Sequence, residues 1–197
     1  MSACLYPTTL PGRELMTISV SIVICTRNRA EALGSCLAAV NALEGKFELV
    51  VVNNASEDHT AQVIEEFASR SRHPVHCVTE PRKGLARARN TGWRAASGDL
   101  IAFTDDDCYP QSDFVSAVAS EFRDDAGLGF IGGRIMLHNP EDLPVTIKES
   151  MEPEHIAPHS FVRAGTVHGA NLVIRRKALQ RSGGFDELLG AGTRYPS

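Results

Sequence analysis

Short apolar runs alternate with amphipathic stretches through the first two thirds of the chain. Runs of bulky and β-branched apolar residues predict buried strands over residues 18–25, 47–52, 75–78 and 100–104. Apolar residues at helical spacing lie between and after these runs, and they predict helices over residues 30–43, 61–68, 85–96 and 114–122. Strands that alternate with helices in this way form a mostly parallel sheet with helices on both faces. We therefore expect an α/β protein of Rossmann-like architecture.

The last third of the chain has a different pattern. It predicts strands over 128–137 and 167–174 and a short helix over 176–182. Between the two strands, residues 139–165 are rich in Pro and His and have no regular periodicity. The sequence therefore predicts a regular first half and a more irregular second half within one domain.

Composition and charge narrow the class of protein. The 197 residues are 43% hydrophobic and 22% charged, which is typical of one globular domain. The net charge of −4 and the lack of a basic stripe argue against a nucleic acid partner. Five cysteines without a CxxC pair predict neither a disulfide framework nor a zinc site, and a reducing, cytoplasmic setting is expected. Residues 1–16 are expected to be a flexible leader, and residues 17–197 to form the domain.

Three aspartates follow the fourth predicted strand directly, at Asp105, Asp106 and Asp107. Ligands of open α/β folds bind at the carboxyl edge of the sheet, where this cluster is predicted to lie. Carboxylate oxygens suit Mg²⁺ or Mn²⁺, and a cation would offset the mutual repulsion of the three charges. A solvated acidic turn before Pro110 explains the same residues equally well.

Polar residues also follow the first three predicted strands. Thr26 and Arg29 end the first strand before a helix whose free N–H groups could bind phosphate, although a helix cap with surface arginines is an equal alternative. Asn54 follows the second strand and could pair with a base or ribose, or simply form a turn. Lys83 precedes a helix and is well placed for a diphosphate, whereas Arg87 and Arg89 fit a solvated helix face.

The ordered set of these segments resembles family 2 glycosyltransferases of the GT-A fold. The segments that carry the resemblance are VSIVICTRNR (20–29), VVNNASED (51–58), GLARARNTG (84–92), ASGD (96–99), FTDDD (103–107), GAN (169–171) and GGFDE (183–187). Together they cover about residues 18–195, and the set is specific although no single motif is. The resemblance implies inverting transfer of a sugar from a UDP- or dTDP-type donor to a glycan or a lipid-linked acceptor, assisted by Mn²⁺ or Mg²⁺.

The resemblance also implies roles for matching residues. Thr26 and Asn54 would line the nucleoside pocket of the donor. Arg29 and Lys83 would also contact the donor, together with Asp105, which would hold the ribose or a metal-bound water. Asp105 and Asp107 match the D-x-D motif, and Asp107 would ligate the cation. His168, Asn171 and Asp186 would border the acceptor. His155 and His159 lie in the irregular segment at spacings that fit no metal site.

Two departures from the family pattern affect the prediction. The family often has Asp where this chain has Asn53 and Asn54, so the nucleotide preference stays open. The general base of the family, typically the Asp of a Glu-Asp pair, would lie beyond Ser197, and the domain is therefore expected to be incomplete at its carboxyl end. Asp186 and Glu187 are weak substitutes for that base, which is needed because a sugar hydroxyl is a poor nucleophile.

Other classes of protein fit the sequence less well or only in part. A non-catalytic donor-binding fragment without the base is the main alternative. A nucleotidyltransferase would carry a glycine-rich loop after the first strand, where this chain has Thr26 to Arg29, and a phosphatase of the haloacid type would carry its Asp motif there. No apolar stretch of about 18 residues predicts a membrane span. Peripheral association with the inner face of a membrane is compatible with a lipid-linked acceptor.

Overall fold

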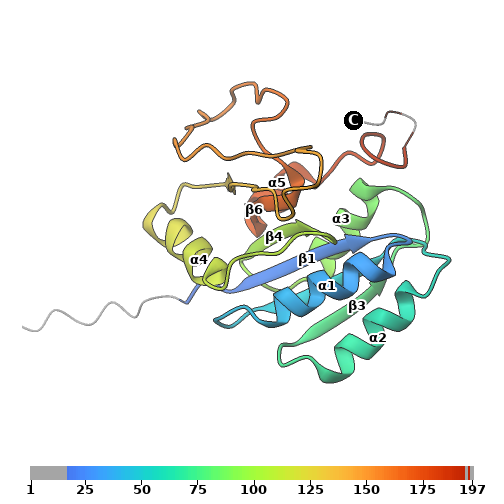
Figure 1. Ribbon diagram of the computed structural model, residues 1–197. Coiled ribbons are helices and arrows are strands. Elements are labelled where there is room, and N and C mark those ends of the chain that lie inside the picture. Colours follow the sequence, from blue (N-terminus) through green and yellow to red (C-terminus); the bar gives the residue numbers. More distant parts are fainter. Residues whose placement is uncertain (1–16, 194, 196–197) are drawn as a thin grey trace, which may run out of the picture.

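The computed structural model describes residues 17–193 and 195, and the predicted leader at 1–16 lies outside them (Figure 1). Within the described part, six strands form one sheet in the order β3-β2-β1-β4-β6-β5. Their bounds are β1 Val20–Thr26, β2 Glu48–Asn53, β3 Val75–Thr79, β4 Leu100–Asp105, β5 Phe130–Gly132 and β6 Leu172–Arg175. The first four strands in the order pair in parallel, and β6 and β5 are antiparallel.

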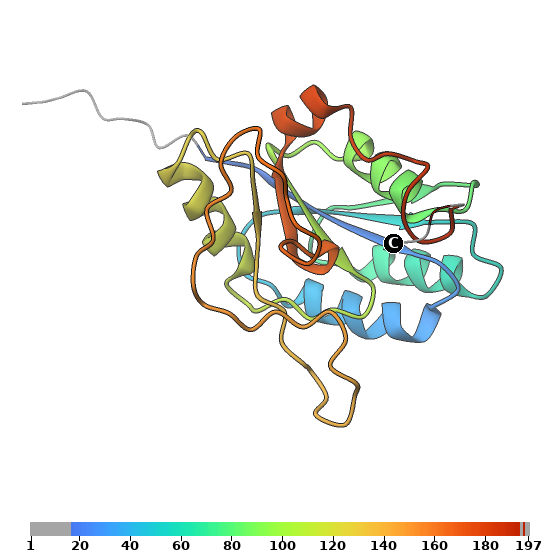
Figure 2. The same cartoon turned by 90° about the horizontal axis from the view of Figure 1, so that it is seen from above.

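Helices cover both faces of the sheet, as predicted (Figure 2). The helices are α1 Ala30–Asn41, α2 Thr60–Arg70, α3 Leu85–Ala95, α4 Phe114–Asp124 and α5 Arg176–Ser182. Alternate residues of a strand point to opposite faces, so Ile22 and Ile24 pack with α1, α2 and α4, while Val23 packs with α3 and α5. The parallel strands β1, β2 and β4 are buried on both faces, which is why they read as continuous apolar runs.

The two strands predicted in the last third are much shorter than expected. The strand predicted over 128–137 is reduced to β5, because the chain leaves the sheet after Gly132 and the Gly133 N–H donates to the Asn171 carbonyl. The strand predicted over 167–174 begins instead with a 3₁₀ turn, η1, at Gly169–Asn171, and only β6 pairs with β4. Between β5 and η1 the chain follows an irregular path that extends away from the sheet (Figure 2).

Glu48 links the amino ends of the central strands. Its carboxylate accepts hydrogen bonds from Ser21 Oγ at 2.5 Å and from Ser97 Oγ at 2.9 Å, and His76 Nε2 lies 3.3 Å away. Burial alone would raise the pKa of Glu48, but the hydrogen bonds from Ser21 and Ser97 outweigh it and lower the pKa below its ordinary value of 4.5. The ionised carboxylate therefore stabilises the fold at pH values above the ordinary pKa. This contribution is lost as the pH falls through the lowered pKa.

Replacing Glu48 by glutamine tests this link. We expect the free energy of unfolding to fall by about 1–2 kcal/mol at pH 7, because the charge-assisted hydrogen bonds are lost. The difference in the free energy of unfolding between the variant and the wild type should become smaller below about pH 4, where the wild-type carboxylate becomes protonated and loses its charge. Urea unfolding at several pH values measures both effects. Glu121→Gln, on the exposed side of α4, is the control, and a gap that is constant with pH would contradict the prediction.

Candidate functional site

The turns that follow β1, β2, β3 and β4 meet at the carboxyl edge of the sheet. The turns after β1 and β2 brace each other: the Asn28 N–H donates to Ser56 Oγ at 3.1 Å, and Asn28 Oδ1 accepts from the Glu57 N–H at 2.7 Å. Asn28 has a φ of 54°, a left-handed conformation that Asn adopts more readily than most residues. This bracing fixes the backbone from which Arg29 extends.

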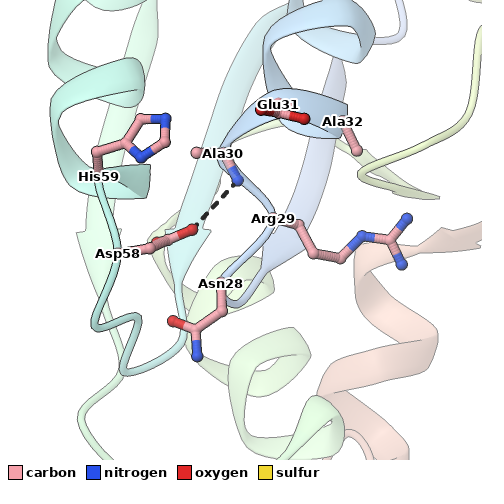
Figure 3. A pocket seen from close by; sticks show the side chains of 7 residues that line it. All are labelled: Asn28, Arg29, Ala30, Glu31, Ala32, Asp58 and His59. Atoms are coloured by element: carbon pink, nitrogen blue, oxygen red, sulfur yellow. Dashed lines mark hydrogen bonds between the residues drawn. The ribbon is translucent and has the colours of Figure 1, made fainter.

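Asp58 caps two helices at once beside a shallow pocket of about 380 Å³ (Figure 3). Its Oδ2 accepts from the Ala30 N–H at 3.4 Å at the start of α1, and its Oδ1 accepts from the Thr60 N–H and hydroxyl at the start of α2. One of the N–H groups expected to bind phosphate at the first helix is therefore already bonded to the Asp58 carboxylate, and phosphate binding there stays a prediction. In Figure 3 the Arg29 side chain extends away from Asp58.

The middle aspartate of the cluster is the most buried. The Asp106 side chain is 8% exposed, and its Oδ2 accepts a 2.6 Å hydrogen bond from the hydroxyl of Thr26. Thr26, which we expected at the nucleoside pocket, is itself buried and holds the cluster against the end of β1. Asp105 and Asp107 remain about half exposed.

Two arginines pair with the three carboxylates. Arg29 Nε lies 3.2 Å from Asp106 Oδ1, and Arg29 Nη2 lies 2.6 Å from Asp107 Oδ2. Arg89 Nη2 lies 3.5 Å from Asp105 Oδ1. Burial raises the pKa of Asp105 and of Asp106, and the nearby arginines oppose that shift.

The sequence suggested that Arg89 lies on a solvated helix face, but the structure places it in a largely buried position. Its side chain is only 17% exposed and lies 5.7 Å above the centre of the Phe185 ring. A Cβ added at Gly169 would lie 2.0 Å from Arg89 Nη2, so a larger residue there would displace the end of the Arg89 side chain. Arg89 therefore connects the aspartate cluster to the η1 turn and to the loop at 183–187.

The loop that carries Lys83 is held by the side chain of Asn54. Asn54 Nδ2 donates to the carbonyls of Glu80 and Arg82 at 3.0 and 2.7 Å, and its Oδ1 accepts from the Gly84 N–H at 3.0 Å. We expected this amide to line a nucleoside pocket, but it is buried and all of these bonds go to the loop. Asn54 thus shapes the site through the loop at 80–84.

Lys83 forms an ion pair with Glu57 at the carboxyl edge of the sheet. Its Nζ is 3.4 Å from Glu57 Oε1, and Arg27 Nη2 is 3.9 Å from the same oxygen. Arg27 Nε is buried and makes no hydrogen bond within the part of the chain described. These two cations follow β1 and β3 and lie at the same carboxyl edge of the sheet, where a diphosphate would bring negative charge.

The loop at 183–187 packs onto α3 through Asn90 and Glu187. The Asn90 amide bonds to both backbone groups of Phe185, and Glu187 pairs with Arg87 at 3.3 Å and with Arg82 at 3.5 Å. Glu187 is therefore engaged by two arginines. Asp186 is exposed, and its Oδ1 accepts from the Leu188 N–H.

Two of the residues expected to border the acceptor, His168 and Asn171, lie at the η1 turn, which contacts β4. Asn171 Nδ2 donates to the Arg134 carbonyl at 2.9 Å, so its amide closes the base of the irregular segment. His168 is partly exposed immediately before η1, whereas His155 and His159 are exposed in the irregular segment. The structure thus brings His168 and Asn171 near the cluster through η1, which contacts β4.

The aspartate cluster suits a hard divalent cation only in part. Among the residues at 17–193 and 195, no three His, Cys, Asp or Glu side chains converge as a metal cage. Asp105 and Asp107 nevertheless offer half-exposed carboxylate oxygens, which Mg²⁺ and Mn²⁺ prefer, and Mg²⁺ sites commonly use one or two carboxylates with substrate phosphates and water. The donor set therefore fits a cation that shares its remaining positions with a diphosphate.

Solved structures with the same fold are glycosyltransferases of the GT-A type. The chain is 25% identical to the mannosyltransferase PcManGT from Pyrobaculum calidifontis, solved with GDP-Man and Mn²⁺, with a TM-score of 0.67 over 89% of this chain and 49% of that one. It also matches S. aureus TarS residues 1–349, with a TM-score of 0.70 at 20% identity, over 89% of this chain and 52% of that one. The predicted fold class is confirmed.

The chain belongs to glycosyl transferase family 2, whose family model matches residues 21–183. Curated relatives include the glycosyltransferase AglE of Haloferax volcanii, 26% identical over 88% of this chain and 58% of AglE. The pre-mycofactocin glycosyltransferase of Mycobacterium tuberculosis is 28% identical over 88% of this chain and 37% of that protein. The chain thus spans 58% of the length of the first of these relatives and 37% of the second. Within the described residues, no helix is both long and apolar enough to cross a membrane.

Proposed function

We propose that this chain forms the donor-binding part of an inverting glycosyltransferase. It would bind a nucleoside diphosphate sugar and direct the sugar to a hydroxyl group of a glycan or of a lipid-linked acceptor. The observation that carries the proposal is the meeting of the Asp105–Asp107 cluster with three other strand-end turns at one sheet edge. The family membership supports the same reading, and the nucleotide-sugar complexes of the structural relatives agree with it.

The aspartate cluster and the loop that carries Lys83 have different roles in donor binding. Thr26 and Arg29 fix the aspartate cluster, while Asn54 positions the loop that presents Lys83 to the diphosphate. Asp105 and Asp107 would hold Mn²⁺ or Mg²⁺, which would supply Lewis-acid stabilisation of the leaving nucleoside diphosphate. The complex of the mannosyltransferase PcManGT with GDP-Man and Mn²⁺ supports this choice of cation.

The acceptor would approach from the side of η1. His168 and Asn171 would border the acceptor at η1, and Asp186 would border it from the loop at 183–187. An acceptor hydroxyl needs a general base, and neither Asp186 nor Glu187 is proposed for that role. Glu187 is paired with two arginines, and Asp186 accepts a hydrogen bond within its own loop. This observation favours, as the second candidate function, donor binding by this chain without turnover.

Calorimetric titration of UDP, dTDP and GDP, with and without Mn²⁺, tests the proposal. We expect one nucleotide to bind more tightly with Mn²⁺, and Asp107→Ala to reduce this gain at least about tenfold, because a cation ligand is lost. Asp124→Ala removes an exposed acid at the end of α4 and should leave binding unchanged. A folded chain that binds none of the nucleotides with Mn²⁺ would refute donor binding. If a nucleotide does bind, an assay of sugar transfer to a simple acceptor separates the two candidate functions, because only the transferase would show turnover.

A further inference from the structure

The two arginines at the aspartate cluster differ in their freedom to move. Arg89 is 17% exposed and is confined between Gly169 and the Phe185 ring, so its guanidinium cannot leave Asp105 without displacing packed groups. Arg29 is 49% exposed and extends from the turn after β1 toward the open edge of the site. Of the two arginines, only Arg29 can therefore easily leave its carboxylate partner.

Arg29 divides its guanidinium between an inner and an outer carboxylate. Its Nε lies 3.2 Å from Asp106, which is buried and also bonded to Thr26. Its Nη2 lies 2.6 Å from Asp107, which is half exposed. A contact between two half-exposed groups contributes little free energy in water, so the outer contact can be given up while the inner one remains.

The braced turn keeps the root of this side chain in place. Asn28 is bonded to Ser56 and to the backbone of Glu57, and Asp58 accepts from the Ala30 N–H. The backbone on both sides of Arg29 is therefore fixed, and any change of partner takes place by rotation of its side chain. Such a rotation needs no movement of the fold.

We propose that Arg29 is an exchange residue, which holds Asp107 before the donor binds and turns to the donor diphosphate afterwards. This inference rests on the proposed function. When Asp107 takes a divalent cation, its charge no longer favours the guanidinium, and the diphosphate offers oxygens that a planar fork can contact in pairs. Arg89 stays on Asp105, so Asp105 and Asp107 have unequal tasks. Arg29 would thus act as a positioning residue that competes with the cation and assists the anion.

Opposite effects on two ligands test the exchange. With Mn²⁺ alone, followed by electron paramagnetic resonance of the free ion, Arg29→Ala should bind the cation about fivefold more tightly, because an ion-pair competitor is gone. With saturating Mn²⁺, the nucleoside diphosphate that the wild type binds should bind roughly tenfold more weakly in calorimetry, because charge-assisted contacts are lost. Arg29→Lys keeps the charge without the fork, so it should bind Mn²⁺ as the wild type does and still bind the nucleotide more weakly.

Arg70→Ala is the matched control, since it removes an exposed arginine from the last turn of α2, at the opposite edge of the sheet. It should leave both affinities near those of the wild type, and unchanged thermal unfolding of each variant guards against misfolding. Weaker binding of both ligands by Arg29→Ala, or no change in either, would overturn the exchange while leaving donor binding intact. A wild type that binds Mn²⁺ but no nucleotide would instead refute the proposed function, and the exchange with it.

Discussion

Replacing Asn90 by alanine should lower the free energy of unfolding by about 3–4 kcal/mol, because buried partners lose their hydrogen bonds. Asn90 is 2% exposed, and its Oδ1 accepts from the Phe185 N–H at 2.9 Å and from Trp93 Nε1 at 3.1 Å. Its Nδ2 donates to the Phe185 carbonyl at 2.8 Å. One side chain thus satisfies groups of α3 and of a loop 95 residues further along the chain.

Urea unfolding followed by circular dichroism measures this loss. The matched control is Asn41→Ala at the end of α1, whose amide oxygen accepts from Ser71 and Arg72 in a more open setting, where water can replace it. We expect the control to cost less than about 1 kcal/mol. Equal losses at Asn41 and Asn90 would mean that the buried amide does not connect the loop to α3 energetically.

Alanine in place of Gly92 should destabilise the fold by about 2 kcal/mol, although alanine favours a helix over glycine. Gly92 lies in α3 against the sheet, and an added Cβ would lie 2.5 Å from Val23 Cγ1 and 3.0 Å from Val52 Cγ2. Both valines are fully buried and cannot move aside without shifting their strands. Overpacking therefore outweighs the gain in helix propensity.

Gly34 in α1 provides a control of the opposite sign. Nothing lies within 4 Å of a Cβ added there, so Gly34→Ala should stabilise the fold by up to about 1 kcal/mol through helix propensity alone. Thermal and urea unfolding of the two single variants give the comparison. Two changes of the same sign would show that packing of α3 on the sheet is looser than the contacts at Gly92 indicate.

The parallel half of the fold could be predicted from sequence because its signals are local. The strands β1, β2 and β4 are short apolar runs, and the helices α1, α2 and α4 each have an apolar face. The rule that ligands bind at the carboxyl edge then places Thr26, Asn54 and Asp105 together, as the structure has them. The family was also predicted from ordered motifs and is confirmed over residues 21–183.

The partners of the polar side chains could not be predicted in this way. Arg89 looked like a surface residue because its partners, Asp105, Gly169 and Phe185, come from distant segments. Asn54 looked like a ligand contact, yet its amide bonds to a loop that only the folded sheet brings near. The lengths of β5 and β6 could not be predicted from their local apolar pattern, since their pairing depends on where the chain turns at Gly133 and Gly169.

The irregular segment between β5 and η1 is closed at its base. The Gly133 N–H donates to the Asn171 carbonyl, and Asn171 Nδ2 donates to the Arg134 carbonyl, so the chain leaves and re-enters the sheet at neighbouring points. Beyond this closure, large apolar side chains such as Leu143, Met151 and Phe161 are more than three quarters exposed. Doubling such a loop costs only about 0.6 kcal/mol in closure entropy. Changes in the length or sequence of this segment can therefore accumulate during evolution without altering the aspartate cluster. The segment can acquire new binding partners in this way while the fold is kept.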